Sequence, residues 1–153
     1  MSRIADRLAE LGFTLPPVAA PVAAYVPAVV QGNLVYTSGQ LPFVDGALPA
    51  TGKVGGAVSA EDAQSYAATC ALNALAAAES VIGSLDRVTQ VVKVTGFVAS
   101  DTAFTGQPGV INGASKLLGE IFGESGIHAR SAVGVAVLPL DAPVEVELIL
   151  AFA

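Results

Sequence analysis

The sequence predicts an α+β protein in which two helices pack on one face of a mixed β-sheet. Two long segments repeat apolar residues at the three- and four-residue spacing of a helix. Five shorter segments are rich in β-branched residues, and the order along the chain is β-β-(loop)-α-β-α-β-β. The other face of such a sheet must also be covered, and copies of the same chain are the simplest candidates.

The first half of the chain is expected to form a short helix and then two paired strands. Helical spacing predicts the helix over residues 3–11, and the Pro- and Ala-rich residues 14–24 predict an extended lead-in. Strands are predicted over residues 25–30 and 33–38, on either side of a turn-prone Gly-Asn pair. The glycine-rich residues 43–56 are expected to form a loop, in which short hairpin strands can occur.

The second half contains both long helices. The first is expected to begin after the N-cap Ser59 and to end near Ile82, before Gly83. Its apolar stripe consists of Ala68, Leu72, Leu75 and Ile82. The second helix is expected to begin at Pro108 and to stop at Gly123. Three strands complete the pattern, over residues 87–98, 129–138 and 144–152.

The composition excludes several classes of protein. Apolar residues make up 53% of the chain and charged residues only 13%, so we expect part of the surface to be buried against copies of the chain. The net charge of −6 argues against nucleic-acid binding, which needs a basic surface. No segment reads as membrane-spanning, and residues 1–7 lack the features of a secretory signal. A single cysteine, Cys70, fits a reducing compartment, so we expect a cytoplasmic protein.

Arg130 and two glutamates are the charged residues that the strands offer for chemistry. Strand alternation places small residues on the face of Arg130: Ala132, Gly134 and Ala136. A guanidinium in such a setting has room to hold a carboxylate through two parallel hydrogen bonds. Glu145 and Glu147 share a face of the last strand, where a carboxylate can position water or move a proton. Spacing alone favours plain roles for all three, as a surface or ion-paired arginine and as exposed glutamates.

The remaining candidates favour structural roles. His128 is the only histidine and so cannot form a metal site, and a surface position is favoured over a proton relay. Cys70 lies among alanines in the middle of a helix, as expected of a buried thiol. The segment Thr37-Ser38-Gly39-Gln40 offers a hydroxyl and backbone N–H groups, but on its own it is typical of a turn.

Two motifs together resemble one known family. The first is Tyr36-Thr37-Ser38-Gly39-Gln40-Leu41-Pro42, which is similar to the family's TSGQ-P strand end. The second is Arg130-Ser131-Ala132-Val133, followed by Leu138-Pro139 and Val144-Glu145-Val146-Glu147 in the family's order and spacing. From about Tyr25 to the C-terminus the sequence therefore resembles the RidA/YjgF/L-PSP family of reactive-intermediate deaminases. The helix and lead-in over residues 1–24 are additions to a single domain over residues 25–153, as in a longer subgroup.

The resemblance implies a chorismate-mutase-like fold that assembles as a homotrimer with ligand clefts between subunits. The best-known members hydrolyse enamines and imines, such as 2-aminoacrylate and 2-iminopropanoate, to 2-oxo acids and ammonia without a metal or organic cofactor. By the same resemblance, Arg130 binds the carboxylate of a small 2-imino or 2-oxo acid, and Glu145 rather than Glu147 positions water. The other cleft positions fall on Tyr25, Ser38, Gly39 and Asn112, and on Ala132, where the family often has cysteine.

Three functions remain open on this basis. The first is hydrolytic deamination of imines and enamines by Arg130 and Glu145. The second is a non-catalytic module that binds small carboxylates in the same cleft, because Ala132 stands where cysteine is frequent. The third is RNA cleavage by an endoribonuclease, a function assigned to some relatives, which the acidic charge balance disfavours.

Overall fold

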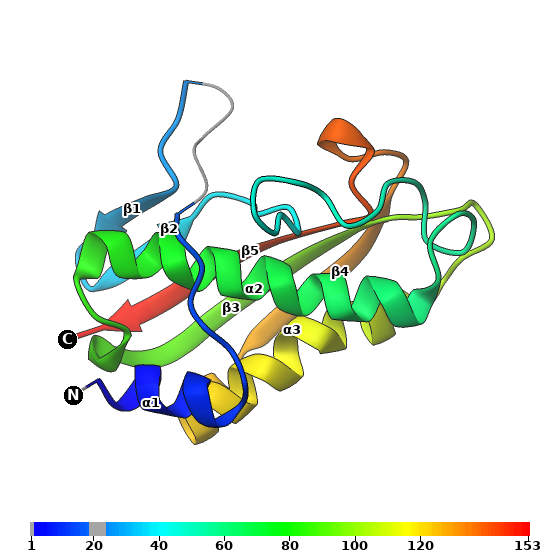
Figure 1. Ribbon diagram of the computed structural model, residues 1–153. Helices are drawn as coiled ribbons and strands as arrows, with labels where there is room; N and C mark the ends of the chain where they lie inside the picture. Colours follow the sequence, from blue (N-terminus) through cyan, green and yellow to red (C-terminus); the bar gives the residue numbers. More distant parts are fainter. Residues whose placement is uncertain (1, 19–23) are drawn as a thin grey trace.

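The computed structural model, which describes residues 2–18 and 24–153, has the predicted mixed sheet and two long helices (Figure 1). The strands are β1 (Ala28–Gln31), β2 (Leu34–Thr37), β3 (Val88–Ala99), β4 (Ala129–Val135) and β5 (Val144–Phe152). The helices are α1 (Arg3–Glu10), α2 (Ala60–Ile82) and α3 (Gln107–Phe122), with short 3-10 helices η1 (Leu85–Arg87), η2 (Gly123–Gly126) and η3 (Pro139–Asp141). The sheet order is β1-β2-β5-β3-β4, and only the β3–β4 pair is parallel among the described strands.

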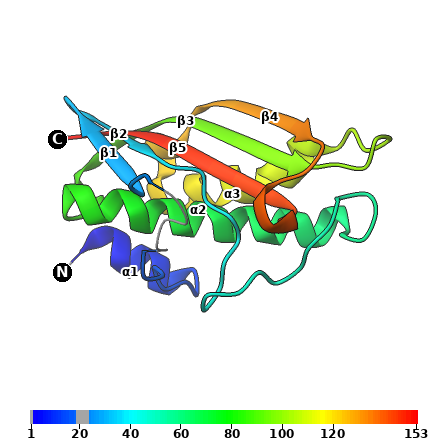
Figure 2. The same ribbon diagram turned by 90° about the horizontal axis from the view of Figure 1, so that it is seen from above.

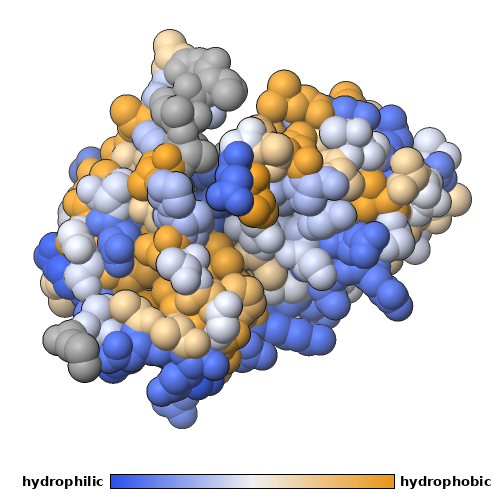
Figure 3. Space-filling model, in the orientation of Figure 1, coloured by the Kyte–Doolittle hydropathy of each residue, from blue (hydrophilic) through white to orange (hydrophobic). Residues whose placement is uncertain are grey.

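Both long helices lie on one side of the sheet, and no described segment covers the other side (Figure 2). We call this uncovered side the open face. In β5 the residues that face the helices are buried: Val144, Val146, Leu148 and Leu150. The open face carries exposed apolar side chains, namely Val29 (53% exposed), Tyr36 (42%) and Val133 (44%). Seen from the helix side, the surface instead mixes hydrophilic and hydrophobic residues (Figure 3).

The helix α2 begins and ends at the predicted caps. The Ser59 hydroxyl accepts a hydrogen bond from the N–H of Asp62 at 3.1 Å, and Gly83 ends the helix with φ of 87°. The middle of α2 is buried on every side from Ala71 to Ala78, which exceeds the single apolar stripe that we predicted. The chain after α1 crosses the outer side of α2 (Figure 1), and Asn73 donates to two carbonyls of the loop after β2.

Two strand boundaries differ from the prediction by more than one residue. Strand β1 begins at Ala28 rather than at residue 25, because Pro27 has no N–H to donate to the sheet. Strand β4 ends at Val135, where the paired strand β3 also ends. Ala136 therefore lies beyond the strand, and its predicted place on the face of Arg130 was wrong.

Smaller differences affect α3 and the two predicted loop segments. Helix α3 begins one residue earlier than predicted, at Gln107, with Pro108 in its first turn. The loop over residues 43–56 contains isolated bridges rather than hairpin strands. In the predicted lead-in over residues 14–24, the described part forms no helix or strand, and residues 19–23 lie outside the described residues.

The first turn of α1 is capped by a carboxylate from a distant part of the chain. Asp86 accepts hydrogen bonds from the N–H groups of Arg3 at 2.9 Å and Ile4 at 2.8 Å. It also accepts one from the hydroxyl of Ser2 at 3.0 Å. These bonds, led by the one from Ile4, lower the pKa of the Asp86 carboxyl.

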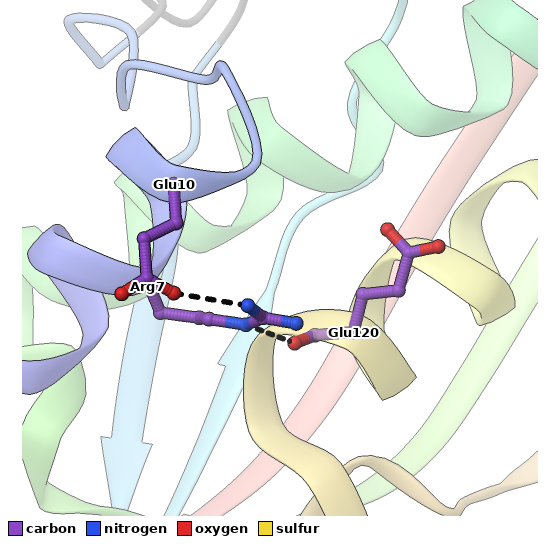
Figure 4. Close-up of polar contacts among 3 residues, drawn as sticks. All are labelled: Arg7, Glu10 and Glu120. Carbon is purple, nitrogen blue, oxygen red and sulfur yellow. Dashed lines mark hydrogen bonds and ion pairs between the residues drawn. The ribbon is translucent and has the colours of Figure 1, made fainter.

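Further along, α1 is attached to α3. Arg7 Nε donates to the backbone carbonyl of Glu120 at 2.8 Å, and Arg7 Nη1 forms an ion pair with Glu10 at 3.0 Å (Figure 4). The side chains of Ile4 and Leu8, both residues of α1, are buried. The N-terminal helix is thus packed into the molecule rather than loosely appended.

We predict that Asp86→Asn lowers the melting temperature at neutral pH. The lowered pKa means that the ionised carboxylate stabilises the folded state above the ordinary Asp value of about 4, and that this contribution is lost as the pH falls through the folded-state pKa. The difference from the wild type should therefore shrink in acid. Thermal unfolding at neutral and at acidic pH checks this, and Asp45→Asn, at an exposed position, is the control. A difference independent of pH would contradict the assignment.

We also predict opposite effects for two glycine-to-alanine changes in α3. A Cβ at Gly113 would lie 1.9 Å from the backbone carbonyl oxygen of Gln64 in α2, so Gly113→Ala should destabilise the fold by about 1–3 kcal/mol. A Cβ at Gly119 meets nothing within 4 Å, so Gly119→Ala should stabilise the helix by about 0.5–1 kcal/mol. Chemical denaturation measures both. Equal effects would mean that the helices do not approach closely at Gly113.

Candidate functional site

Arg130 lies on the helix side of the sheet, beneath α3. In the sheet register it pairs with Val94 of β3, which pairs in turn with Leu148 of β5, and both of these partners are buried under the helices. The guanidinium Nη1 donates to Asn112 Oδ1 at 2.8 Å and to Ser115 Oγ at 3.3 Å. The structure therefore brings together Arg130 and Asn112, two of the predicted site residues.

The guanidinium of Arg130 has neutral partners only. Among the described residues no carboxylate forms an ion pair with it, and the ion pair that is present joins Arg7 to Glu10. Two donors of Nη1 are used, whereas Nε and Nη2 have no partner among the described residues. No buried side-chain nitrogen there lacks a partner, so these free N–H groups must reach solvent. Arg130 is thus a fixed cation with an unused edge.

Small residues follow Arg130 on the same face. Ala132 is half-buried against the core, and a Cβ at Gly134 would lie 2.8 Å from Nε2 of Gln107. The predicted sharing of a face therefore holds for Ala132 and Gly134. We refer to Arg130, Asn112 and Ala132 as the arginine half-site.

Glu145 lies on the open face, beside Gly39. A Cβ at Gly39 would lie 2.5 Å from Glu145 Oε1, so only glycine leaves room for the carboxylate in this position. The pKa of the Glu145 carboxyl is raised. The larger cause is its partial burial, and the smaller is the nearby negative charge of Glu147. A raised pKa makes the ionised carboxylate a better base, which suits proton transfer.

The segment before Gly39 is tied to the end of the lead-in. Ser38 donates its hydroxyl to the carbonyl of Val26 at 2.7 Å and its N–H to the carbonyl of Pro27 at 2.8 Å. The hydroxyl and the N–H of Ser38 are therefore already engaged as donors within the chain. Tyr25, one residue before Val26, is 46% exposed. We refer to Tyr25, Ser38, Gly39 and Glu145 as the glutamate half-site.

The two half-sites lie on opposite faces of one sheet. Arg130 shares the face of Leu148, whereas Glu145 alternates with residues of that face and points the other way. Strand β3 also separates β4 from β5. A single chain therefore does not bring the predicted carboxylate anchor and the predicted water-positioning group together.

Two further residues lie near Arg130, namely Ser115, which the sequence analysis missed, and His128, whose setting it predicted wrongly. Ser115 Oγ lies 2.8 Å from Nε2 of His128, and Nδ1 of His128 lies 2.6 Å from the carbonyl oxygen of Gly126. His128 is half-buried with both ring nitrogens bonded, so the prediction of a plain surface histidine was wrong. The available signal was the three-residue spacing of Asn112 and Ser115, which puts both on one face of a helix.

Cys70 has no place in either half-site. It is completely buried as predicted, and burial raises the pKa of its thiol.

The described residues contain neither a metal-binding cluster nor a membrane-spanning helix. In this part of the chain no group of three His, Cys, Asp or Glu side chains is close enough to hold a metal ion. No helix within residues 2–18 and 24–153 is long and apolar enough to cross a membrane.

A hollow of about 400 Å³ lies elsewhere, between α1 and the end of α3. Its lining includes Arg3, Arg7 and Phe122. Arg7 is already bonded to Glu10 and to the backbone of α3.

The sequence matches one protein-family model over residues 5–152, described as "YjgF/chorismate_mutase-like, putative endoribonuclease". The chain belongs to this YjgF family. The predicted family and fold are therefore confirmed, and the match includes most of α1 as well as the sheet and the long helices.

Similar proteins come from several organisms. Protein TCP17 of Trypanosoma cruzi is 45% identical over 146 residues, which cover 95% of this chain and 91% of that protein. The crystal structure of Atu1372 from Agrobacterium tumefaciens is 47% identical, with a TM-score of 0.92 over 99% of this chain and 93% of that one. The crystal structure of Escherichia coli TdcF with bound serine is 28% identical, with a TM-score of 0.63 over 91% of this chain and 94% of that one.

We predict that Glu147→Gln lowers the raised pKa of Glu145 only in part. The neighbouring charge is the smaller cause of the shift, and burial remains after the change. NMR titration of the side-chain carboxyl carbons measures this pKa directly. Glu61→Gln, at an exposed position on α2, is the control. A pKa that returns fully to the ordinary Glu value would show that burial is not the main cause.

Proposed function

We propose that this protein hydrolyses 2-imino acids and their enamine tautomers to 2-oxo acids and ammonia. The observation that carries the proposal is the guanidinium of Arg130, which is held by neutral partners and keeps an unused edge. Such an edge suits a planar carboxylate, which accepts two parallel charge-assisted hydrogen bonds. A small carboxylic acid is thus the ligand that the arginine half-site fits best.

Glu145 supplies the second group that the reaction needs. As a carboxylate of raised pKa it accepts a proton from water while the water oxygen attacks the imine carbon. The proton passes to the nitrogen, giving a carbinolamine. Loss of ammonia from this intermediate leaves the carbonyl of the 2-oxo acid. The imine is already electrophilic, so the reaction requires neither a metal nor an organic cofactor.

The active site in this proposal forms between chains of a homotrimer. Arg130 and Glu145 lie on opposite faces of one sheet, so a cleft that uses both must take one from each of two subunits. The exposed apolar residues of the open face support association through that face. One cleft would then combine the arginine half-site of one copy with the glutamate half-site of the next.

The alternative is a module that binds a small carboxylate without turning it over. Ala132 supports it, because the resemblance to deaminases implies that this position often holds cysteine. The serine bound by TdcF, a small molecule with a carboxylate, is compatible with either function. We place the protein in the cytoplasm on its single, completely buried thiol.

We predict that the protein accelerates 2-oxo acid release from imino acids generated by an amino-acid oxidase. Arg130→Ala should lower kcat/KM by at least about a hundredfold, because the carboxylate loses a bidentate partner. Glu145→Gln should lower kcat by about 10²–10⁴-fold and remove the fall in rate at low pH, since only the ionised carboxylate acts as a base. The controls are Arg3→Ala and Glu61→Gln, at exposed positions on other elements.

An absence of acceleration across several imino acids would exclude the deaminase proposal. If 2-oxo acids then still raise the melting temperature of the wild type but not of Arg130→Ala, the protein is a carboxylate-binding module. An undiminished rate in Arg130→Ala would remove Arg130 from the reaction.

We predict that mixing two inactive variants restores activity. In mixed oligomers of Arg130→Ala and Glu145→Gln, some clefts receive an intact arginine from one chain and an intact glutamate from another. Random mixing in equal amounts should recover about a quarter of the wild-type rate in the whole population, and about a third in the mixed trimers alone. Co-expression with two affinity tags isolates the mixed oligomers, and a sedimentation experiment checks for the trimer. No recovery in mixed oligomers would mean that the two residues do not act across chains.

A further inference from the structure

A line of polar groups lies behind Arg130, on the side away from its unused edge. It runs from Arg130 Nη1 to Ser115 Oγ at 3.3 Å, from Ser115 Oγ to His128 Nε2 at 2.8 Å, and from His128 Nδ1 to the carbonyl oxygen of Gly126 at 2.6 Å. We propose that Ser115 and His128 are positioning residues that hold the guanidinium so that its Nε–Nη2 edge faces the substrate carboxylate. This inference rests on the proposed carboxylate-binding role of Arg130.

The direction of each hydrogen bond in this line follows from the carbonyl at its end. The Gly126 oxygen can only accept, so His128 Nδ1 must carry the hydrogen. In the neutral ring Nε2 is then an acceptor, and the hydroxyl of Ser115 must donate to it. This donation leaves a lone pair of Ser115 Oγ for the N–H of Arg130. The sole histidine thereby determines which way the serine hydroxyl points.

The far end of the line is held by close backbone packing. Gly126 is buried, and a Cβ at this position would lie 2.4 Å from the backbone carbonyl oxygen of Leu118 in α3. The carbonyl that orients His128 therefore belongs to a segment that sits directly on the helix carrying Ser115. The far end of the polar line is thus packed against the helix that carries Ser115.

At the guanidinium, the contacts use one nitrogen only. Asn112 and Ser115, three residues apart on one face of α3, both accept from Nη1. Nη1 has two hydrogens, so both are used and neither is left for the ligand. The edge formed by Nε and Nη2 remains, and it has the fork geometry that matches a carboxylate. Ser115 and His128 thus select the edge of Arg130 that is presented.

The first test is the tautomer of His128, which needs no assay of activity. Because the chain has one histidine, ¹⁵N NMR of histidine-labelled protein gives a single pair of ring signals. In the neutral ring we expect Nδ1 to be protonated and Nε2 to be a hydrogen-bonded acceptor. In Ser115→Ala the Nε2 signal should move toward that of a free acceptor, whereas Nδ1 should stay protonated. The opposite tautomer in the wild type would overturn the proposed line.

The second test separates positioning from a merely structural role. Titration calorimetry with 2-oxobutanoate should show Kd raised about fivefold to tenfold in Ser115→Ala and in His128→Leu, the size expected when one hydrogen bond of ordinary strength is lost. Ser115→Thr, which keeps the hydroxyl, and His128→Gln, which can place an acceptor near Nε2, should recover most of the affinity. Ser65→Ala, at an exposed helix position, is the matched control and should bind like the wild type.

The outcomes distinguish this inference from the proposed function. If Arg130→Ala abolishes binding of 2-oxobutanoate but folded Ser115→Ala and His128→Leu bind it like the wild type, Arg130 remains the anchor and the positioning role is wrong. If affinity falls in both variants and returns in Ser115→Thr and His128→Gln, the positioning role stands. If Arg130→Ala also binds like the wild type, the carboxylate site itself is wrong and both proposals fall.

Discussion

The alternation of residues along β5 is the constraint on which the rest of the structure depends. Four aliphatic side chains of this central strand are buried under the helices, so Glu145 and Glu147 must face the other way. The pairing register continues through β3 to β4, where Arg130 lies in line with Val94 and Leu148 and therefore on the helix side. A shift of β5 by one residue would bury both glutamates in the core. Hydrophobic burial thus decides where each charged group of the candidate site lies.

Local signals in the sequence were sufficient for most of the fold. The cap at Ser59 and the glycine at Gly83 delimit α2 correctly, because capping depends on a few neighbouring residues. The insertion of β5 between β2 and β3 could not be predicted, since it depends on pairing between segments far apart in the chain. The burial of the middle of α2, from Ala71 to Ala78, was missed for the same reason, because the chain after α1 covers it only in the folded molecule.

The sequence predicted the members of the candidate site better than their arrangement. In β5 the faces can be read from the sequence, because valine and leucine alternate with glutamate. In β4 they cannot, because Val133 and Val135 alternate with Ala132 and Gly134, and the larger residues would be expected to face the core. The structure has the reverse, with Val133 exposed on the open face and Ala132 against the core. Close packing of α3 leaves room only for the small side chains and for Arg130.

The separation of Arg130 from Glu145 has a chemical advantage in the proposed reaction. If one chain brought the two charges together, they would form an ion pair that occupies the guanidinium edge and lowers the pKa of the carboxyl. Each group would then lose the property that the reaction needs. Because the two groups lie apart, Arg130 keeps a free guanidinium edge, and burial can raise the pKa of Glu145. In the proposed trimer, a cleft between subunits would admit a substrate between two groups that have not neutralised each other, with its carboxylate toward Arg130 and its imine carbon toward Glu145.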